Sequence, residues 1–275
     1  MAAKSPKTKE FEQYLTDPTD AQVGHGDYLV SPGTAFLKYT VEAKDAVDLA
    51  ARKFPTKKNG EYTKDSLDSL QHIVTAMVPA VMGHFETYQR YLFAGAFDMS
   101  VHLADFDVDK FMAKLDKVSS VSIDPVRLSA HRGLGAESIG ILLADSLSGW
   151  HNPTRVNELF GAFNLKRQLF SGEDCDRLAT LWQLRHSIVH TGGTLTLPDA
   201  QKVPALAGHG NCKTVFEKNF IYEISRKLHP VVKRSTEGFG AQYKTNLQAG
   251  VAADVGRKVS EFFRVGSSIS AWLKT

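Results

Sequence analysis

The sequence predicts an all-α fold, and three observations lead to this prediction. Apolar residues recur at helical spacing over long stretches of the chain. No run of alternating apolar and polar residues exceeds five positions, and we found no internal repeat. Residues typical of helix starts and ends bracket the periodic stretches. With 275 residues, 43% of them hydrophobic, the chain is long enough to bury a sizeable core.

The beginning of the chain has a different pattern from the rest. Residues 1–34 are predicted to form an irregular arm, because Pro18, Gly24-His25-Gly26 and Pro32-Gly33 interrupt any helical spacing. The Gly-x-Gly here lacks a flanking strand and helix, so we reject it as a phosphate-binding loop. An amphipathic helix is then predicted over 34–54.

A much longer helix is predicted from Thr63 or Asp65, either of which could cap it, to about Phe97. Its apolar residues fall in one stripe about 100° wide, as in a helix that faces a core. Pro79 lies outside this stripe and is expected to kink the helix. The stripe contains Leu67, Leu70, Val74, Met77, Val78, Val81, Phe85, Tyr88 and Leu92.

The remaining periodic stretches predict further helices and one short extended segment at 194–197. These helices cover 107–117, 136–148, 152–163, 174–190, 214–228 and 251–273. Gly192-Gly193 is a good signal for the end of the helix over 174–190. We therefore expect a helical core over 35–200 and a C-terminal helical extension over 201–275, packed on the same domain.

Composition excludes several classes of protein. Two cysteines, Cys175 and Cys212, are too few for a disulfide scaffold or a tetrahedral thiolate metal site. The longest uncharged run, 69–85, has 17 residues and contains polar side chains, so no membrane span is expected. Residues 1–10 lack the apolar segment of a secretory signal. We expect a soluble, cytoplasmic protein.

The charge is mildly basic, with a net charge of +3 and a pI near 8.7. Six basic residues against two acidic ones give +4 over 213–234, and Lys57, Lys58 and Lys64 crowd a short loop. Solvated surface charge explains any one such cluster. Local positive charge permits a nucleic-acid partner without requiring one.

The helix over 174–190 carries the most informative pattern. On a wheel of about 100° per residue, Arg185 falls near the middle of an apolar stripe. A guanidinium keeps its charge, so burying it there is expensive unless an anion meets it. His186 and His190, one turn apart, lie beside the stripe. This helix therefore directs one fixed cation and two imidazoles toward one interface. The stripe is made by Leu178, Leu181, Trp182, Ile188 and Val189.

Simpler interpretations stay open at this point. Arg185 could be a structural residue paired with a carboxylate, with both histidines satisfied by ordinary hydrogen bonds. The His-x-x-x-His spacing of His186 and His190 also occurs in zinc sites. However, Ser187 replaces the protease glutamate, and no third ligand is evident, so we predict no metal and no cofactor.

The run from Leu181 to Gly193, LWQLRHSIVHTGG, resembles the signature of the HEPN superfamily of all-α domains. The family pattern is an arginine, a polar residue, three to five further positions and a histidine, late on a helix. Arg185, His186 and His190 match it, although asparagine or aspartate is commoner at the position of His186. The helix containing Phe85–Tyr91 loosely resembles the family's first long helix. Together the two matches cover 65–97 and 173–193.

The resemblance implies a HEPN-like helical bundle and a metal-independent endoribonuclease. In such an enzyme the ribose 2′-hydroxyl attacks the adjacent phosphorus and leaves a cyclic phosphate. Arg185 would stabilise the phosphorane oxygens. His190 would transfer a proton, preferably as general acid, and His186 would orient it or contact a phosphate. Glu86 is a candidate partner for Arg185.

The resemblance also implies partners. HEPN domains pair about a twofold axis so that two motifs line one cleft, which predicts a homodimer. Trp182 could contact the second copy or stack on a base, although such a residue more often belongs to the core. Basic residues could follow the RNA backbone. Family members often act in toxin or phage-defence systems, where an antitoxin or regulatory protein controls them. The residues expected to contact RNA are Lys213, Lys218, Arg226 and Lys227.

Two other hypotheses compete with the ribonuclease. One is a non-catalytic HEPN-like module that dimerises or binds a partner, with Arg185 and His190 in structural roles. An intact Arg and His weigh against it, since a scaffold need keep neither. The other is an unrelated helical protein with a fortuitous motif.

Overall fold

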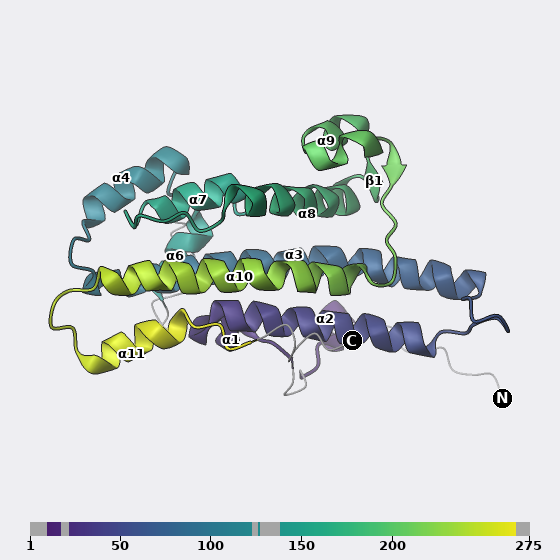
Figure 1. The fold of residues 1–275 in the computed structure, drawn as a ribbon, viewed down its shortest axis with the longest axis horizontal. Helices are drawn as coiled ribbons and strands as arrows, with labels where there is room; N and C mark the ends of the chain where they lie inside the picture. The colour runs from purple at the N-terminus through teal and green to yellow at the C-terminus, as the bar shows by residue number, and fades with distance from the viewer. Residues whose placement is uncertain (1–9, 18–21, 123–125, 127–137, 268–275) are drawn as a thin grey trace.

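Four long helices run along the longest axis of the molecule (Figure 1). The computed structural model describes residues 10–17, 22–122, 126 and 138–267. Within these ranges the chain is mostly helical, and the one sheet is a two-stranded antiparallel hairpin of β1 (Thr194–Leu195) and β2 (Cys212–Lys213). The all-α prediction is confirmed. The four helices are α2 (Pro32–Lys53), α3 (Lys64–Asp98), α8 (Gly172–His190) and α10 (Phe220–Thr245).

Shorter elements surround the long helices. The α-helices among them are α1 (His25–Val30), α4 (Val108–Val118), α6 (Ile139–Ser146), α7 (Pro153–Gly161), α9 (Leu197–Gln201) and α11 (Ala253–Phe262). Three short 3-10 helices are η1 (Phe11–Tyr14), η2 (Ser100–His102) and η3 (Pro204–His209). In the view of Figure 1, α4, α7, α8 and α9 form an upper tier above α3 and α10, and α1, α2 and α11 lie below.

The central helix α3 holds the core together, because it packs against α2, α6, α8 and α10. The stripe expected on it is buried at seven of its nine positions; Met77 is partly buried and Leu67 is exposed. Leu67 lies in the first turn of α3. No helix in the described ranges is long and apolar enough to cross a membrane.

Side chains at helix starts explain why the predicted boundaries agree with the structure. Thr63, Asp107, Asn152 and Ser171 each accept a hydrogen bond from the backbone N–H three residues later, at the starts of α3, α4, α7 and α8. Such caps satisfy amide groups that have no partner within the helix. The sequence predicted such a cap only for α3, at Thr63 or Asp65. The apolar period located the starts of all four helices to within two residues.

The N-terminal arm differs from the prediction. The irregular segment expected over 1–34 contains η1 and α1, and α2 already begins at Pro32. Tyr28 of α1 is buried, and its hydroxyl is 2.8 Å from Nδ1 of His84 on α3. A helix of six residues is too short to show a period, and proline is well tolerated in a first turn. Residues 1–9 and 18–21 lie outside the described part.

The C-terminal part also differs. The helix expected over 214–228 begins at Phe220 and continues to Thr245, past Pro230. Proline usually interrupts a helix, which is why the sequence suggested an end before it. The segment expected to be extended up to Leu197 is strand only at 194–195, and α9 and η3 were not predicted. α11 ends at Phe262, and 268–275 lie outside the described residues.

α10 belongs to the same core as the N-terminal helices. The hydroxyls of Tyr88 and Thr236 are 2.9 Å apart, and the Tyr243 hydroxyl donates to the carbonyl oxygen of Ala96 at 2.8 Å. All four residues are buried. Residues 220–245 are therefore packed into the centre of the molecule, between α2 and α3.

Close packing between α3 and α6 gives a first prediction. A Cβ atom added to Gly140 would lie 2.2 Å from the carbonyl oxygen of Ala94. Gly140→Ala should therefore push the helices apart and lower the free energy of unfolding by about 1–3 kcal/mol. Urea denaturation followed by circular dichroism would measure the change. Gly83→Ala, inside α3 with open space around it, is the control and should stabilise by up to about 1 kcal/mol. Equal effects at both sites would contradict the packing argument.

Candidate functional site

The C-terminal end of α8 is fixed by two glycines. Gly192 and Gly193 have φ angles of 61° and 79°, a region that favours glycine. The turn they make lets the backbone N–H of Thr191 and that of Gly193 both donate to the carbonyl oxygen of Ser187, at 3.2 and 3.0 Å. The chain then enters β1, where Thr194 pairs with Lys213 of β2. The predicted helix end is confirmed, and it places the last turn of α8 against a hairpin.

The two histidines of the motif lie side by side on this last turn. The ring centroids of His186 and His190 are 4.7 Å apart, with an angle of 41° between the ring planes. His190 is exposed and His186 is partly exposed. The i, i+4 spacing puts two proton-transfer groups next to each other at the surface.

Arg185 lies on a different side of the helix. His190 is five positions after Arg185, and five steps of about 100° place the two side chains about 140° apart around the helix axis. The side chain is partly buried, and its Nε has no hydrogen-bond partner among the described residues. No described carboxylate lies within 4.0 Å of the guanidinium, as the ion pairs show. The cation is thus neither neutralised nor on the same face as the histidines.

Glu86 does not pair with Arg185. Its carboxylate receives a hydrogen bond from Arg90, one turn along α3, at 2.6 Å. Arg90 also contacts Asp145 of α6 at 3.1 Å. Glu86, the candidate partner named for Arg185, is therefore paired with Arg90 instead. The i, i+4 partner on its own helix is closer than a residue on α8.

Trp182 is a core residue, as the more frequent role of such a tryptophan suggested. It is 6% exposed, and its ring centroid lies 6.5 Å from that of Phe85 on α3 and 6.4 Å from the ring of His151. Its indole Nε1 has no partner within the described part of the chain. The rest of the stripe is uneven, because Leu178 and Leu181 are buried whereas Val189 is 47% exposed.

A pocket of about 460 Å³ opens beside His186. α8 forms one wall of the pocket. The start of α7, with His151 before it, forms a second wall, and the residues after α9 form a third. Asp176, Cys175 and Gln183 line it from α8, and Lys202 with Val203 closes it from the side of α9. His151 faces these residues from the loop before α7. Sequence reasoning missed His151 and Lys202, because segments remote in sequence bring them to α8.

The charges around this pocket are partly compensated. Lys202 lies 2.7 Å from Asp199, and the Thr196 hydroxyl also donates to this carboxylate. These two contacts, with a smaller contribution from His186, hold the pKa of Asp199 below its usual value. Burial, with Asp174 and Asp176 nearby, raises the pKa of the Cys175 thiol. A thiolate nucleophile is therefore disfavoured here. Within the described ranges, no three His, Cys, Asp or Glu side chains gather where they could hold a metal ion.

The basic residues expected to contact RNA are all exposed, but they lie in three places. Lys213 is on β2, next to the end of α8. Lys218 lies over the ring of Tyr62, 5.5 Å from its centroid, on the far side of α10. Lys227 lines a groove between α8 and α10, and Arg226 is paired with Glu223 at 2.8 Å. Only Lys213 is placed near the histidine pair.

Comparisons with family models, with curated proteins and with solved structures found no match.

Proposed function

We propose that this protein is a metal-independent endoribonuclease whose reacting groups are His190, His186 and Arg185. The observation that carries the proposal is the histidine pair, with ring centroids 4.7 Å apart at the exposed end of α8. Arg185, directly before His186, is a cation without a carboxylate partner among the described residues. Imidazoles can accept and donate protons near neutral pH. A guanidinium is always positively charged and can therefore bind a phosphate.

The chemistry needs three events. One imidazole, His186 in our assignment, accepts the proton of the ribose 2′-hydroxyl as its oxygen attacks the adjacent phosphorus. Arg185 stabilises the charge on the phosphorane oxygens. His190 donates a proton to the departing 5′-oxygen as the P–O bond breaks. The products are a 2′,3′-cyclic phosphate and a 5′-hydroxyl, and neither a metal nor a cofactor takes part.

The geometry of α8 favours a shared site. Arg185 and His190 point about 140° apart on one helix, so a single chain brings them to one phosphate with difficulty. In a dimer whose twofold axis passes beside α8, the histidines of one chain would lie opposite the arginine of the other. We therefore propose a homodimer with α8 at its interface. The family resemblance extends the proposal to a cytoplasmic toxin or phage-defence system, restrained by an antitoxin or regulatory protein.

RNA cleavage in the presence of EDTA tests the proposed chemistry. The wild-type protein should cut total RNA and leave cyclic phosphate ends, because the substrate supplies the nucleophile. His190→Ala should slow cleavage by about 10²–10⁴-fold through loss of proton transfer. His209→Ala, in η3, is a control for a histidine outside the site and should cut at the wild-type rate. Abolition of cleavage by EDTA, or full activity of His190→Ala, would overturn the mechanism.

The dimer gives a separate prediction. Sedimentation at micromolar concentration and moderate salt should show a homodimer, and a charge at Val189 should dissociate it. Val189 is 47% exposed and lies next to His190 on α8, so Val189→Glu would put two carboxylates into the interface. Val108→Glu, at a similarly exposed valine on α4, should leave the dimer intact. A strictly monomeric wild-type protein would contradict the shared site.

A further inference from the structure

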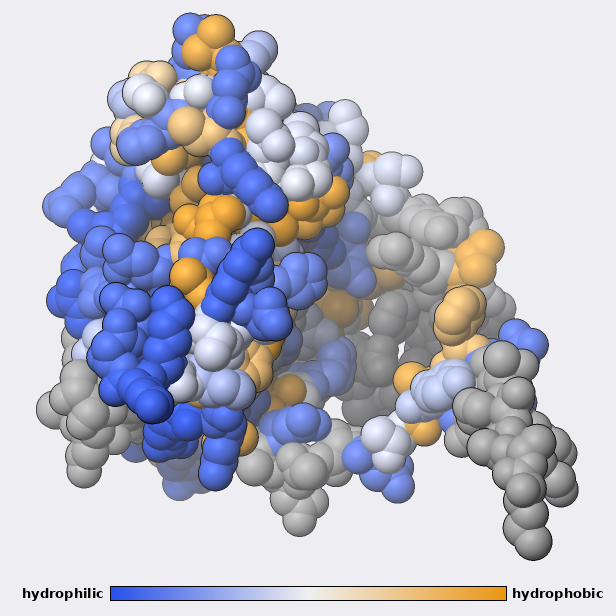
Figure 2. Space-filling view, turned by 90° about the vertical axis from the view of Figure 1, so that its right-hand side faces the viewer, coloured by the Kyte–Doolittle hydropathy of each residue, from blue (hydrophilic) through white to orange (hydrophobic). Residues whose placement is uncertain are grey.

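Basic residues that are far apart in sequence lie close together at one end of the molecule. Lys57 and Lys58 lie in the turn between Thr56 and Tyr62, which form an isolated antiparallel bridge. Lys218, more than 150 positions later in the chain, lies over the Tyr62 ring at 5.5 Å from its centroid. Figure 2 looks onto this end, and hydrophilic side chains cover much of its left half. The fold thus creates a basic surface that neither segment has alone.

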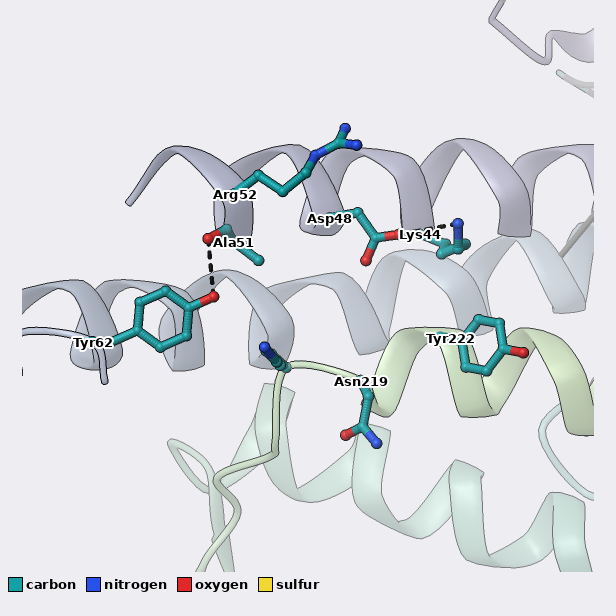
Figure 3. A pocket seen from close by; sticks show the side chains of 8 residues that line it. Lys44, Asp48, Ala51, Arg52, Tyr62, Asn219 and Tyr222 are labelled. Atoms are coloured by element: carbon teal, nitrogen blue, oxygen red, sulfur yellow. Dashed lines mark hydrogen bonds and ion pairs between the residues drawn. The ribbon is translucent and has the colours of Figure 1, made fainter. Parts of the chain in front are cut away.

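A pocket of about 330 Å³ is lined by Tyr62 and Lys218 of this surface. α2 supplies one wall, the segment before α3 supplies Tyr62, and the start of α10 supplies Tyr222 (Figure 3). The Tyr62 hydroxyl donates to the carbonyl oxygen of Ala51 at 2.9 Å, which fixes the tyrosine against α2. In Figure 3 the two tyrosines stand at opposite ends of the pocket.

The pocket has an excess of positive charge. Three cations, Lys44, Arg52 and Lys218, line it against one carboxylate, Asp48. Lys44 lies 3.0 Å from Asp48, so these two charges compensate each other. Arg52 and Lys218 are both exposed, and neither has a carboxylate within 4.0 Å among the described residues. Two cations are therefore free to meet an anion.

The start of α10 adds a further electrostatic contribution. Asn219 is the N-cap residue, and its side chain makes no capping hydrogen bond. It lines the pocket, so the positive end of a 26-residue helix dipole opens beside Lys218. Free cations, a helix N-terminus and two aromatic rings are the groups with which proteins bind single-stranded nucleic acids.

We infer that this pocket binds one nucleotide of a single-stranded RNA, at a site separate from the histidine pair. Arg52 and Lys218 hold the phosphate, and Tyr222 offers its ring to the base. The choice of RNA as the polyanion rests on the proposed function. The binding itself requires no cleavage, because none of these residues belongs to α8.

Fluorescence anisotropy with a labelled 2′-O-methyl oligonucleotide of about a dozen residues tests the inference. This probe cannot be cut, because its 2′-oxygen carries no proton. Lys218→Glu and Arg52→Glu should each raise the Kd by about tenfold at low salt, and both should reduce the salt dependence. Tyr222→Ala should also weaken binding, by about fivefold or more.

Lys117→Glu is the matched control, since it makes the same charge change at an exposed lysine of α4, at the opposite end of the molecule. Its Kd should stay within about twofold of the wild type. Equal effects at Lys117 and Lys218, or none at Lys218, would overturn the inference. Binding that depends on Lys218 in a protein without ribonuclease activity would keep the inference and reject the proposed function. Cleavage of RNA by a protein whose RNA affinity is unchanged in Lys218→Glu would keep the proposed function and reject the inference.

Discussion

Arg185→Ala should reduce RNA cleavage by a hundredfold or more, of the order observed when one stabilising donor is removed from a charged transition state (about 10²–10³). The guanidinium has no carboxylate partner among the described residues, so its charge is available for a phosphorane. Initial rates on a fluorogenic RNA substrate, compared with the wild-type protein, would measure the loss.

Arg185→Lys separates charge from geometry. Lysine retains the positive charge but lacks the planar fork that holds two phosphate oxygens, so it should restore little activity. Arg177→Ala is the control on the same helix, because Arg177 is bound to Glu173 at 2.8 Å, two turns from the motif. Circular dichroism must show all three variants folded. Wild-type rates in Arg185→Ala would refute the role, and unfolding of that variant would assign Arg185 a structural role.

Asp174→Ala should lower the free energy of unfolding by about 3 kcal/mol, at the lower end of the cost of breaking a buried ion pair. The Asp174 side chain is 2% exposed, and Arg234 of α10 contacts both of its carboxylate oxygens at 2.8 Å. The same carboxylate accepts a hydrogen bond from the Ser171 hydroxyl at 2.7 Å. The substitution removes both contacts. Arg234 is half exposed, and solvent limits the loss.

The effect should depend on pH. Burial alone would raise the pKa of Asp174, but hydrogen bonds from Arg234 and Ser171 outweigh it and hold the pKa below its ordinary value of 3.8. A carboxyl whose pKa is lower in the folded than in the unfolded state stabilises the protein at pH values above the unfolded pKa. This stabilisation is lost as the pH falls through the folded pKa. The stability difference between the wild type and Asp174→Ala should therefore be full at pH 7 and shrink below about pH 4.

Urea titrations at several pH values would measure this difference. Glu223→Gln is the control, since it breaks the more exposed pair with Arg226 and should change stability by at most about 1 kcal/mol. A pH-independent difference for Asp174→Ala would mean that the cavity left by the side chain, rather than its charge, sets the cost.

Local signals in the sequence were sufficient for most helices. The apolar period located α3, α4, α7 and α8, and for α3 a capping residue was predicted as well, because such features act within a few residues. α10 was misjudged because Pro230 is tolerated inside a helix that the core holds on several sides. α1 and α9 are too short for a period, and tertiary contacts such as that between Tyr28 and His84 define them.

In the candidate site, too, local signals predicted neighbours on one helix but not contacts between elements. The adjacency of His186 and His190 follows from helical spacing alone, and the structure confirms it. The sequence could not show that Glu86 pairs with Arg90 rather than with Arg185, because a contact between Glu86 and Arg185 depends on how α3 and α8 face each other. His151 and Lys202 reach the pocket through loops whose paths no local pattern encodes.

The segment from β1 to β2 has a small hydrophobic cluster of its own, apart from the main core. Its buried residues are Leu195, Ala200, Val203 and Leu206, and the partly buried Ala179 and Leu184 of α8 pack against them. We expect so small a cluster to give the segment a low local unfolding free energy, so that its amide hydrogens should exchange with solvent while those of α3 stay protected. Lys202 and Val203 belong to this segment and line the pocket beside His186, so local opening should widen the pocket while the rest of the fold stays intact. A ligand that bridges α8 and α9 would close this segment and slow its exchange.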